Sequence, residues 1–344
     1  MSGETKNLSP QDMAVTFGLL ALGLSVLLLG AKYFVEGMAA LAKAFGMSPL
    51  IVGMTVVAFG TSTPELVINA LSAYRGETAL AFGNIVGSST LNIGFVLAVT
   101  ALIRPLKVEP SLITREIPML CVAVGALLIL GSDLRLGGAG PDLFTRGDGL
   151  ILLLLFGIFV YYTAILSIVK NKLTGVSPDP FMVKVTEKAT RQPRKALGRQ
   201  TIAAVLGLIA VSLGASWTVD GATGVARLIG MSENLIGLTI VSFGTTLPEL
   251  VTCIVAARRG NAEIALGNVV GSNLFNILAV GGIVSTIQPV AVPAGGHLDL
   301  LFMAFLSAVL LPVAIRSGLT ITRTEGAFLL VVYLLYMGWR LAGT

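Results

Sequence analysis

Charged residues are scarce in this sequence. Asp, Glu, Lys and Arg make up 12% of its 344 residues, whereas a soluble globular domain carries about 25%. Hydrophobic residues make up 55%, and several apolar runs approach the length of about 20 residues that crosses a bilayer as a helix. The shortage of charge therefore excludes an ordinary water-soluble domain, and the apolar runs predict an all-α polytopic membrane protein.

Histidine and cysteine are also nearly absent. The one histidine, His297, falls in a short polar segment, and the two cysteines, Cys121 and Cys253, fall inside apolar segments without metal-binding spacing. Buried cysteines of this kind act as small hydrophobic residues. Because the sequence shows no histidine base, activated nucleophile or cluster of metal-binding side chains, it predicts neither an enzyme nor a bound cofactor.

The apolar segments predict ten transmembrane helices. The polar stretch 170–199 carries eight Lys and Arg residues, and cytoplasmic loops collect such residues, so we expect this linker in the cytoplasm and the N-terminus outside. Seventeen basic residues then fall inside and six outside, as in a multi-pass protein of the cell (inner) membrane. The net charge of +5 is thus a topology signal rather than a nucleic-acid patch. The predicted spans are 13–34, 47–74, 79–103, 112–131, 149–169, 200–218, 232–257, 263–287, 298–315 and 325–341.

The two halves of the sequence repeat one another at a constant offset of 184 residues. Pro-Glu-Leu-Val at 64–67 recurs at 248–251, and about half of positions 46–95 are identical to their counterparts. Because each half has five spans, an odd number, the second half enters the membrane from the opposite side, as in transporters built from inverted repeats. The predicted units are a five-helix repeat over 1–169 with its core at 46–105, the linker 170–199, and a second five-helix repeat over 200–344 with its core at 230–289.

Each repeat places one carboxylate in the middle of a span. Glu65 and Glu249 end the motifs Gly-Thr-Ser-Thr-Pro-Glu and Gly-Thr-Thr-Leu-Pro-Glu. A charged side chain at this depth costs about 2.5–3.5 kcal/mol on insertion scales, and such residues usually bind ions or substrates. No Lys or Arg lies in the central part of any predicted span. The pair therefore predicts a cation-binding site, rather than two structural ion pairs.

The proline before each carboxylate predicts a broken helix. Pro64 and Pro248 cannot donate a backbone hydrogen bond and clash with the preceding turn, so the helix should kink or open there. The freed carbonyls at 58–60 and 242–244 become possible oxygen ligands, because irregular backbone at membrane depth is tolerated where it lines a cavity. Hydroxyl groups stand beside the carboxylates at Thr61, Ser62, Thr245 and Thr246.

The helix after each motif carries further oxygens at helical spacing. Ser88 and Asn92 are four residues apart, as are Ser272 and Asn276, so each pair shares one face. Small and polar residues in membrane helices also serve close packing. We assign that role to Ser89 and Asn273 and leave Asn84 and Asn268 open, whereas the repeat favours ion ligation for the two Ser/Asn pairs.

The predicted site contains only oxygen donors. Ca²⁺ takes six to eight oxygens and fits this set, whereas Mg²⁺ prefers a tight octahedron and retains its waters. Na⁺ binds the same donors. The two carboxylates balance the charge of one Ca²⁺, and the same cluster could hold more than one Na⁺.

The repeated motifs resemble those of a known family. Gly-Thr-Ser-Thr-Pro-Glu with Gly-Asn-Ile-Val-Gly-Ser-Ser-Thr-Leu-Asn, and Gly-Thr-Thr-Leu-Pro-Glu with Gly-Asn-Val-Val-Gly-Ser-Asn-Leu-Phe-Asn, are similar to the α-repeats of the calcium/cation antiporter superfamily, in its microbial sodium/calcium exchanger branch. The resemblance implies that the first and sixth spans slide against the other eight. The ion ligands it implies are Thr61, Ser62, Glu65, Ser88, Asn92, Thr245, Thr246, Glu249, Ser272 and Asn276, with the backbone carbonyls of Ala58 and Ser242.

The sequence departs from the family pattern at two ligand positions. Asn276 stands where many microbial and potassium-dependent relatives have Asp, which removes a third carboxylate and argues against K⁺ dependence. Thr246 replaces the more usual Ser and keeps the hydroxyl. The resemblance thus implies an antiporter that exchanges Ca²⁺ for Na⁺ and acts as a monomer. Ca²⁺/H⁺ exchange remains the alternative, because either buried carboxylate could carry a proton, and a cation channel is the alternative of another class.

Overall fold

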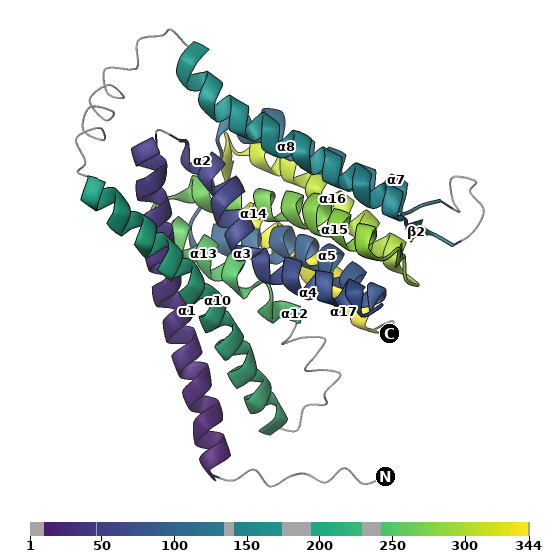
Figure 1. Cartoon of the computed structure of the whole chain (residues 1–344), viewed down its shortest axis with the longest axis horizontal. Coiled ribbons are helices and arrows are strands. Elements are labelled where there is room, and N and C mark those ends of the chain that lie inside the picture. Colours follow the sequence, from purple (N-terminus) through teal and green to yellow (C-terminus); the bar gives the residue numbers. More distant parts are fainter. Residues whose placement is uncertain (1–9, 46, 134–140, 174–193, 229–241, 343–344) are drawn as a thin grey trace.

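The computed structural model describes residues 10–45, 47–133, 141–173, 194–228 and 242–342. Helices make up nearly all of this part of the chain (Figure 1), as predicted. Several of them contain π-helical segments, labelled η, and four two-residue strands join helix ends.

The first half runs from a long N-terminal helix through a broken span to α8. Its elements are α1 (Pro10–Phe45), α2 (Pro49–Val52), η1 (Gly53–Val57), α3 (Ala58–Thr61), α4 (Thr63–Tyr74), α5 (Thr78–Leu91), η2 (Asn92–Leu97), α6 (Ala98–Ile103), β1 (Leu106–Lys107), η3 (Leu112–Glu116), α7 (Ile117–Leu130), β2 (Leu143–Phe144) and α8 (Arg146–Leu173).

In its described residues, the second half follows the same order of elements, except that no segment corresponds to η3. They are α10 (Arg194–Leu228), α12 (Ser242–Gly244), α13 (Leu247–Arg258), α14 (Ala262–Leu274), η5 (Phe275–Val280), α15 (Gly281–Ile287), β3 (Val290–Ala291), α16 (Gly296–Arg316), β4 (Thr320–Ile321) and α17 (Arg323–Ala342). The offset of 184 residues relates the first residues of α1 and α10, of α4 and α13, and of β1 and β3. The turns after α4 and α13 end on glycines with φ of 80° and 83°, Gly76 and Gly260, a conformation that favours glycine.

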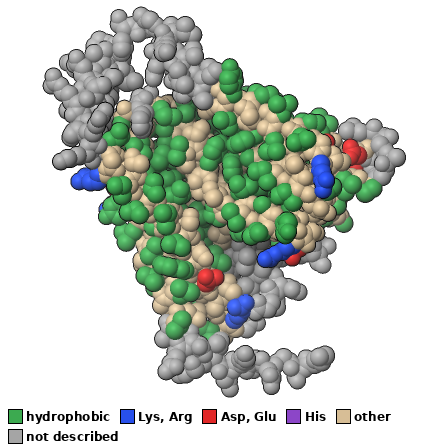
Figure 2. All heavy atoms as spheres, viewed as in Figure 1, with side chains coloured by type: hydrophobic (Ala, Val, Ile, Leu, Met, Phe, Trp, Pro, Cys, Tyr) green, Lys and Arg blue, Asp and Glu red, His purple; other side chains and the backbone are tan. Residues whose placement is uncertain are grey.

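Seven helices in the described residues are long and apolar enough to cross a membrane, or eight if the bent pair Pro49–Thr61 and Thr63–Tyr74 forms one span. Of the other two predicted spans, 232–257 lies partly outside the described residues, and 325–341 forms the 20-residue helix α17, which is not among those candidates. Apolar side chains are spread over the described part of the face shown in Figure 2 and charged ones are few, in agreement with a multi-pass membrane protein.

The first and sixth predicted spans are longer than the sequence indicated. The prediction ended the first span at residue 34, but α1 continues to Phe45; the sixth was predicted over 200–218, but α10 covers Arg194–Leu228. The ends of both helices carry charged residues, so hydropathy alone does not predict that the helices extend that far. The ends of the predicted linker are therefore helical, in α8 and α10, and its middle, 174–193, lies outside the described residues.

Glycines hold α1 and α10 in close contact along their length (Figure 1). A Cβ built on Gly214 of α10 would lie 2.4 Å from the backbone nitrogen of Leu27, and one built on Gly30 of α1 would lie 2.7 Å from that of Val211. Such contacts leave no room for a side chain and fix the register of the two helices. The glycines recur every seven residues at repeat-related positions: Gly23, Gly30 and Gly37 on α1, and Gly207, Gly214 and Gly221 on α10.

Each short sheet joins the two halves of the chain. Strand β1 pairs with β4 and β2 pairs with β3, both antiparallel. The two most buried of the candidate spans are Thr78–Ile103, which contains α5 and η2, and Ala262–Ile287, which contains α14 and η5. They carry the second set of predicted ligands.

Candidate functional site

Both motifs interrupt their helices, as the prolines predicted. Ser62 separates α3 from α4 with φ −89° and ψ 8°, and the two helices meet at a bend of 46°. Thr246 separates α12 from α13 with φ −94° and ψ 0°. Pro64 and Pro248 lie in the first turns of α4 and α13, where the missing N–H is tolerated. Each carboxylate thus begins a new helix.

The two carboxylates are buried and close to one another. Glu65 and Glu249 are each 1% exposed, and their charges interact. Ser62 in the first motif donates a hydrogen bond of 2.7 Å to Oε1 of Glu249 in the second. None of the ion pairs found in the described residues includes either glutamate. The site therefore concentrates negative charge that the described part of the protein does not neutralise.

Two π-helical segments that carry predicted asparagine ligands pack against the helices of the carboxylates. Asn92 is the first residue of η2 and Asn276 the second of η5. Segment η2 packs against α13, which carries Glu249, and η5 packs against α4, which carries Glu65. The wider turn of a π-helix moves backbone groups out of the regular ladder, and such segments are frequent at functional sites.

Buried side-chain oxygens of several predicted ligands lack hydrogen-bond partners within the described part of the chain. A buried acceptor without a partner costs about 1–3 kcal/mol, and more when it is charged. Carboxylate and amide oxygens can only accept hydrogen bonds, so a hydrogen-bond donor or a cation would satisfy them. The unpartnered atoms are Oε1 and Oε2 of Glu65, Oε2 of Glu249, Oδ1 of Asn92 and Asn276, Oγ of Ser272 and Oγ1 of Thr246.

Other predicted ligands already have partners in this structure. Thr61 donates to the side-chain oxygen of Asn268 at 3.2 Å and lies 3.1 Å from the carbonyl of Val57. Ser88 donates to Asn84 at 2.8 Å, in the same helix. Thr245 also takes part in an interaction. These side chains would have to share or exchange their contacts to bind an ion.

The two predicted carbonyl ligands differ from one another. The Ala58 carbonyl is not freed by the break, because it accepts from the Ser62 nitrogen at 3.0 Å and lies 3.3 Å from the Thr61 hydroxyl. It retains capacity for a second contact, as carbonyl oxygens have two lone pairs. Ser242 begins α12, and Thr246 donates to Phe243 rather than to Ser242.

Sequence reasoning missed two buried oxygens one turn beyond the carboxylates. Asn69, four residues after Glu65, is buried, and its Oδ1 has no partner among the described residues. Thr252, three residues after Glu249, is also buried, and its Oγ1 has no partner among them either. The repeat could not reveal them, because the counterpart of Asn69 is Cys253. Helical spacing from each glutamate was the available signal.

Asn273 has the packing role that the sequence suggested. It donates to the Ser89 carbonyl at 3.1 Å and accepts from Asn92 at 3.0 Å, which ties α14 to α5 and orients the Asn92 amide. Asn268, which the sequence left open, accepts from Thr61 and donates to the sulfur of Cys253 at 3.3 Å.

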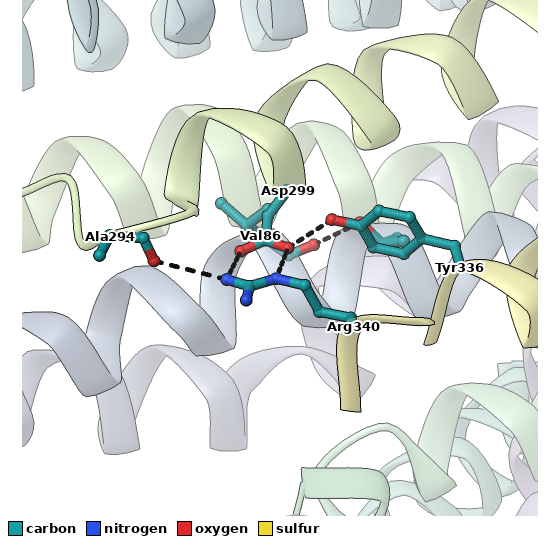
Figure 3. A network of polar contacts seen from close by, with 6 residues as sticks. Val86, Ala294, Asp299, Tyr336 and Arg340 are labelled. Atoms are coloured by element: carbon teal, nitrogen blue, oxygen red, sulfur yellow. Dashed lines mark hydrogen bonds and ion pairs between the residues drawn. The ribbon is translucent and has the colours of Figure 1, made fainter. Parts of the chain in front are cut away.

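Figure 3 shows a different carboxylate, that of Asp299, whose oxygens have hydrogen-bond and ion-pair partners. Arg340 of α17 contacts both carboxylate oxygens of Asp299 on α16, at 3.0 and 3.1 Å, and Tyr336 donates to the same carboxylate at 2.5 Å. The ring of Phe302 stacks on Tyr336 with centroids 3.7 Å apart. This carboxylate is neutralised by its partners and ties α16 to α17, unlike Glu65 and Glu249.

Comparison with known proteins gives a consistent result. The family model described as "Sodium/calcium exchanger protein" matches residues 15–165 and 200–342. A putative antiporter, CaxA, of Alkalimonas amylolytica is 35% identical over 94% of this chain and 98% of its own length. The sodium/calcium exchanger MaX1 of Methanosarcina acetivorans is 29% identical over 94% and 98%.

A solved structure has the same fold. The sodium-calcium exchanger NCX_Mj superimposes with a TM-score of 0.79 and 29% sequence identity, over 95% of this chain and 99% of the other. The residues that the family model matches include both motifs.

Proposed function

This chain belongs to the sodium/calcium exchanger protein family, in the microbial branch of the calcium/cation antiporter superfamily, and from that premise we propose that it exchanges Ca²⁺ for Na⁺. It is a cation antiporter by family. The finer proposal concerns the coupling ion and the site: Ca²⁺ and Na⁺ compete for one all-oxygen site near the middle of the membrane.

The two buried carboxylates, which no cation of the described residues neutralises, carry this proposal. Glu65 and Glu249 supply two negative charges at 1% exposure each, and two charges balance one Ca²⁺. Amide and hydroxyl oxygens around them complete the hard-donor environment that Ca²⁺ and Na⁺ share. The proposed ligands are Glu65, Glu249, Thr61, Ser62, Thr245, Thr246, Ser88, Asn92, Ser272 and Asn276, with the carbonyls of Ala58 and Ser242.

Alternating access follows if the two halves are inverted repeats. We infer ten spans, five in 1–169 and five in 200–344, with the N-terminus outside and 170–199 in the cytoplasm, in a cell (inner) membrane. Inverted halves can exchange conformations, so that the shared site opens to one side and then to the other. The proposed functional unit is a single chain.

Reconstitution in liposomes tests the coupling ion. We expect ⁴⁵Ca²⁺ uptake when a Na⁺ gradient is imposed, saturation with Ca²⁺, and no uptake with a K⁺ gradient alone. Uptake driven by a pH gradient but not by Na⁺ would assign the protein to Ca²⁺/H⁺ exchange. Currents that do not saturate and need no counter-ion would indicate a channel.

A further inference from the structure

Repeat-related faces of α13 and α4 have different surroundings. On α13, Val251 and Val255 are partly buried and pack against an apolar cluster that α1 and α10 form together. Their counterparts on α4, Val67 and Leu71, are 51% and 50% exposed. The cluster of α1 and α10 consists of Leu27, Ala31, Val211 and Ala215. The α1–α10 pair therefore covers one of two related helix faces.

An ion pair holds α1 against α13 at the end of the covered face. Arg259, directly after α13, donates to Oε1 of Glu36 on α1. The repeat places the same charges at the uncovered face: Arg75 directly follows α4, and Asp220 lies on α10. Both of these residues are exposed, and neither side chain has a hydrogen bond or ion pair within the described part of the chain.

The glycine contacts pack α1 and α10 into a single unit. Because a Cβ at Gly207 would lie 2.5 Å from the backbone of Phe34, and one at Gly221 would lie 2.5 Å from that of Leu20, neither helix can slide along the other without losing close backbone contact. Glu36 and Asp220 precede Gly37 and Gly221 of these contacts. A shift that takes Glu36 away from Arg259 therefore also moves Asp220.

We propose that Glu36–Arg259 and Asp220–Arg75 form a two-position charge switch, in which one ion pair exists at a time. In the first position, seen here, the α1–α10 pair covers α13. In the second, it covers Val67 and Leu71 of α4, and Asp220 pairs with Arg75 on the opposite side of the membrane. The inference rests on the proposed inverted halves and adds the residues that set the balance between their two conformations.

The strength of an exposed ion pair suits such a switch. Exposed pairs stabilise a structure only slightly, so neither position is locked. A small difference in free energy is nevertheless enough to change a two-state population several-fold. Loss of one pair should thus shift the equilibrium toward the other position without preventing transport.

Cysteine cross-linking of the full chain in liposomes tests the second position. A variant with Arg75→Cys and Asp220→Cys carries one cysteine of the tested pair in each half, and a protease site is placed between 174 and 193. After cleavage, the two halves run together on a non-reducing gel only when a disulfide has formed between these cysteines. We expect the cross-link to form slowly, and several-fold faster when Glu36→Gln is added. Lys32→Gln, which removes a nearby charge from the same helix, should leave the rate unchanged.

A cross-link that does not form, or whose rate does not respond to Glu36→Gln, would overturn the switch. A charge exchange, Glu36→Arg with Arg259→Glu, covers the case in which the cysteine variants misfold. It should restore the exchange rate that Glu36→Gln alters, and failure to restore it would also contradict the proposal. The cross-link is measured on a gel, independently of ion flux. Na⁺-driven Ca²⁺ uptake in a protein that forms no cross-link would refute the switch but not the proposed exchange. A cross-link in a protein that shows no Na⁺-driven Ca²⁺ uptake would refute the proposed exchange but not the switch.

Discussion

The hydroxyl of Ser62 donates a 2.7 Å hydrogen bond to Oε1 of Glu249, a residue 187 positions away in the other repeat. This contact joins the helix break of the first half to the carboxylate of the second. It leaves the other oxygen of Glu249 and both oxygens of Glu65 without partners among the described residues. The helix break of one half therefore meets the carboxylate of the other, as the proposed shared site requires.

Replacement of Ser62 by Ala should weaken Ca²⁺ binding without removing it. The variant loses a proposed ligand hydroxyl and the hydrogen bond to Glu249, while both carboxylates remain. We expect the KM for Ca²⁺ in Na⁺-driven uptake to rise about 10- to 150-fold, since a hydrogen bond to a charged group contributes about 1.5–3 kcal/mol and about 1.4 kcal/mol corresponds to a factor of ten. Thr63→Ala is the matched control, because Thr63 is exposed and its hydroxyl contacts only the Phe59 carbonyl within the described residues. Equal effects of both changes would contradict the assignment.

Glu65→Gln and Glu249→Gln should each abolish Ca²⁺ transport while the protein still folds. One remaining carboxylate cannot balance a divalent cation, whereas loss of a buried, unpaired charge removes a desolvation cost. We expect melting temperatures, measured without Ca²⁺, at or above that of the unmodified protein. Glu77→Gln, at the exposed start of α5, should change neither property. Transport at the normal rate in either site variant would show that these carboxylates do not bind the transported ion.

Asn276→Asp should change which ions the protein accepts. The substitution adds a third carboxylate where an amide oxygen is now buried without a partner in the described chain. We expect tighter binding of Ca²⁺ and a change in the charge moved per cycle, measured as current across a planar membrane. Asn261→Asp, in the turn before α14, adds the same charge outside the site. An unchanged profile for the Asn276 variant would place this residue outside the ligand shell.

A side chain larger than hydrogen at Gly214 should disrupt the α1–α10 pair. The new Cβ of Gly214→Val would lie 2.4 Å from the Leu27 backbone, and overpacking of this kind costs about 1–3 kcal/mol. We expect a melting temperature lower by several degrees and reduced uptake. Gly198→Val on the same helix is the control, because a Cβ there has no atom within 4 Å. Similar loss in both variants would mean that the helix, rather than the close contact, is sensitive.

The repeat made much of this structure accessible from the sequence. Identical residues at an offset of 184 located both helix breaks and both carboxylates, because Pro64 and Pro248 act locally on the backbone. The long helices α1 and α10 were underestimated, since their ends carry charges and only tertiary packing keeps them helical. The seven-residue spacing of their glycines was visible in the sequence but has meaning only when the partner helix is known.

Hydrogen-bond partners were not accessible in the same way. The sequence treated Ser88 and Ser272 as equivalent, yet Ser88 donates to Asn84 while the Ser272 hydroxyl has no partner in the described chain. Such differences depend on which conformation the two halves adopt, and identical repeat sequences cannot encode them locally. The π-helical segments that begin near Asn92 and Asn276 are likewise set by packing.

Direct measurement of Ca²⁺ binding tests the central claim. Equilibrium dialysis with ⁴⁵Ca²⁺ should find one Ca²⁺ per chain, displaced by Na⁺ as the concentration of Na⁺ rises, and no Ca²⁺ bound to the Glu65→Gln, Glu249→Gln double variant. Ca²⁺ that remains bound to the double variant with the same affinity, or that Na⁺ does not displace, would contradict a shared site built on these two carboxylates.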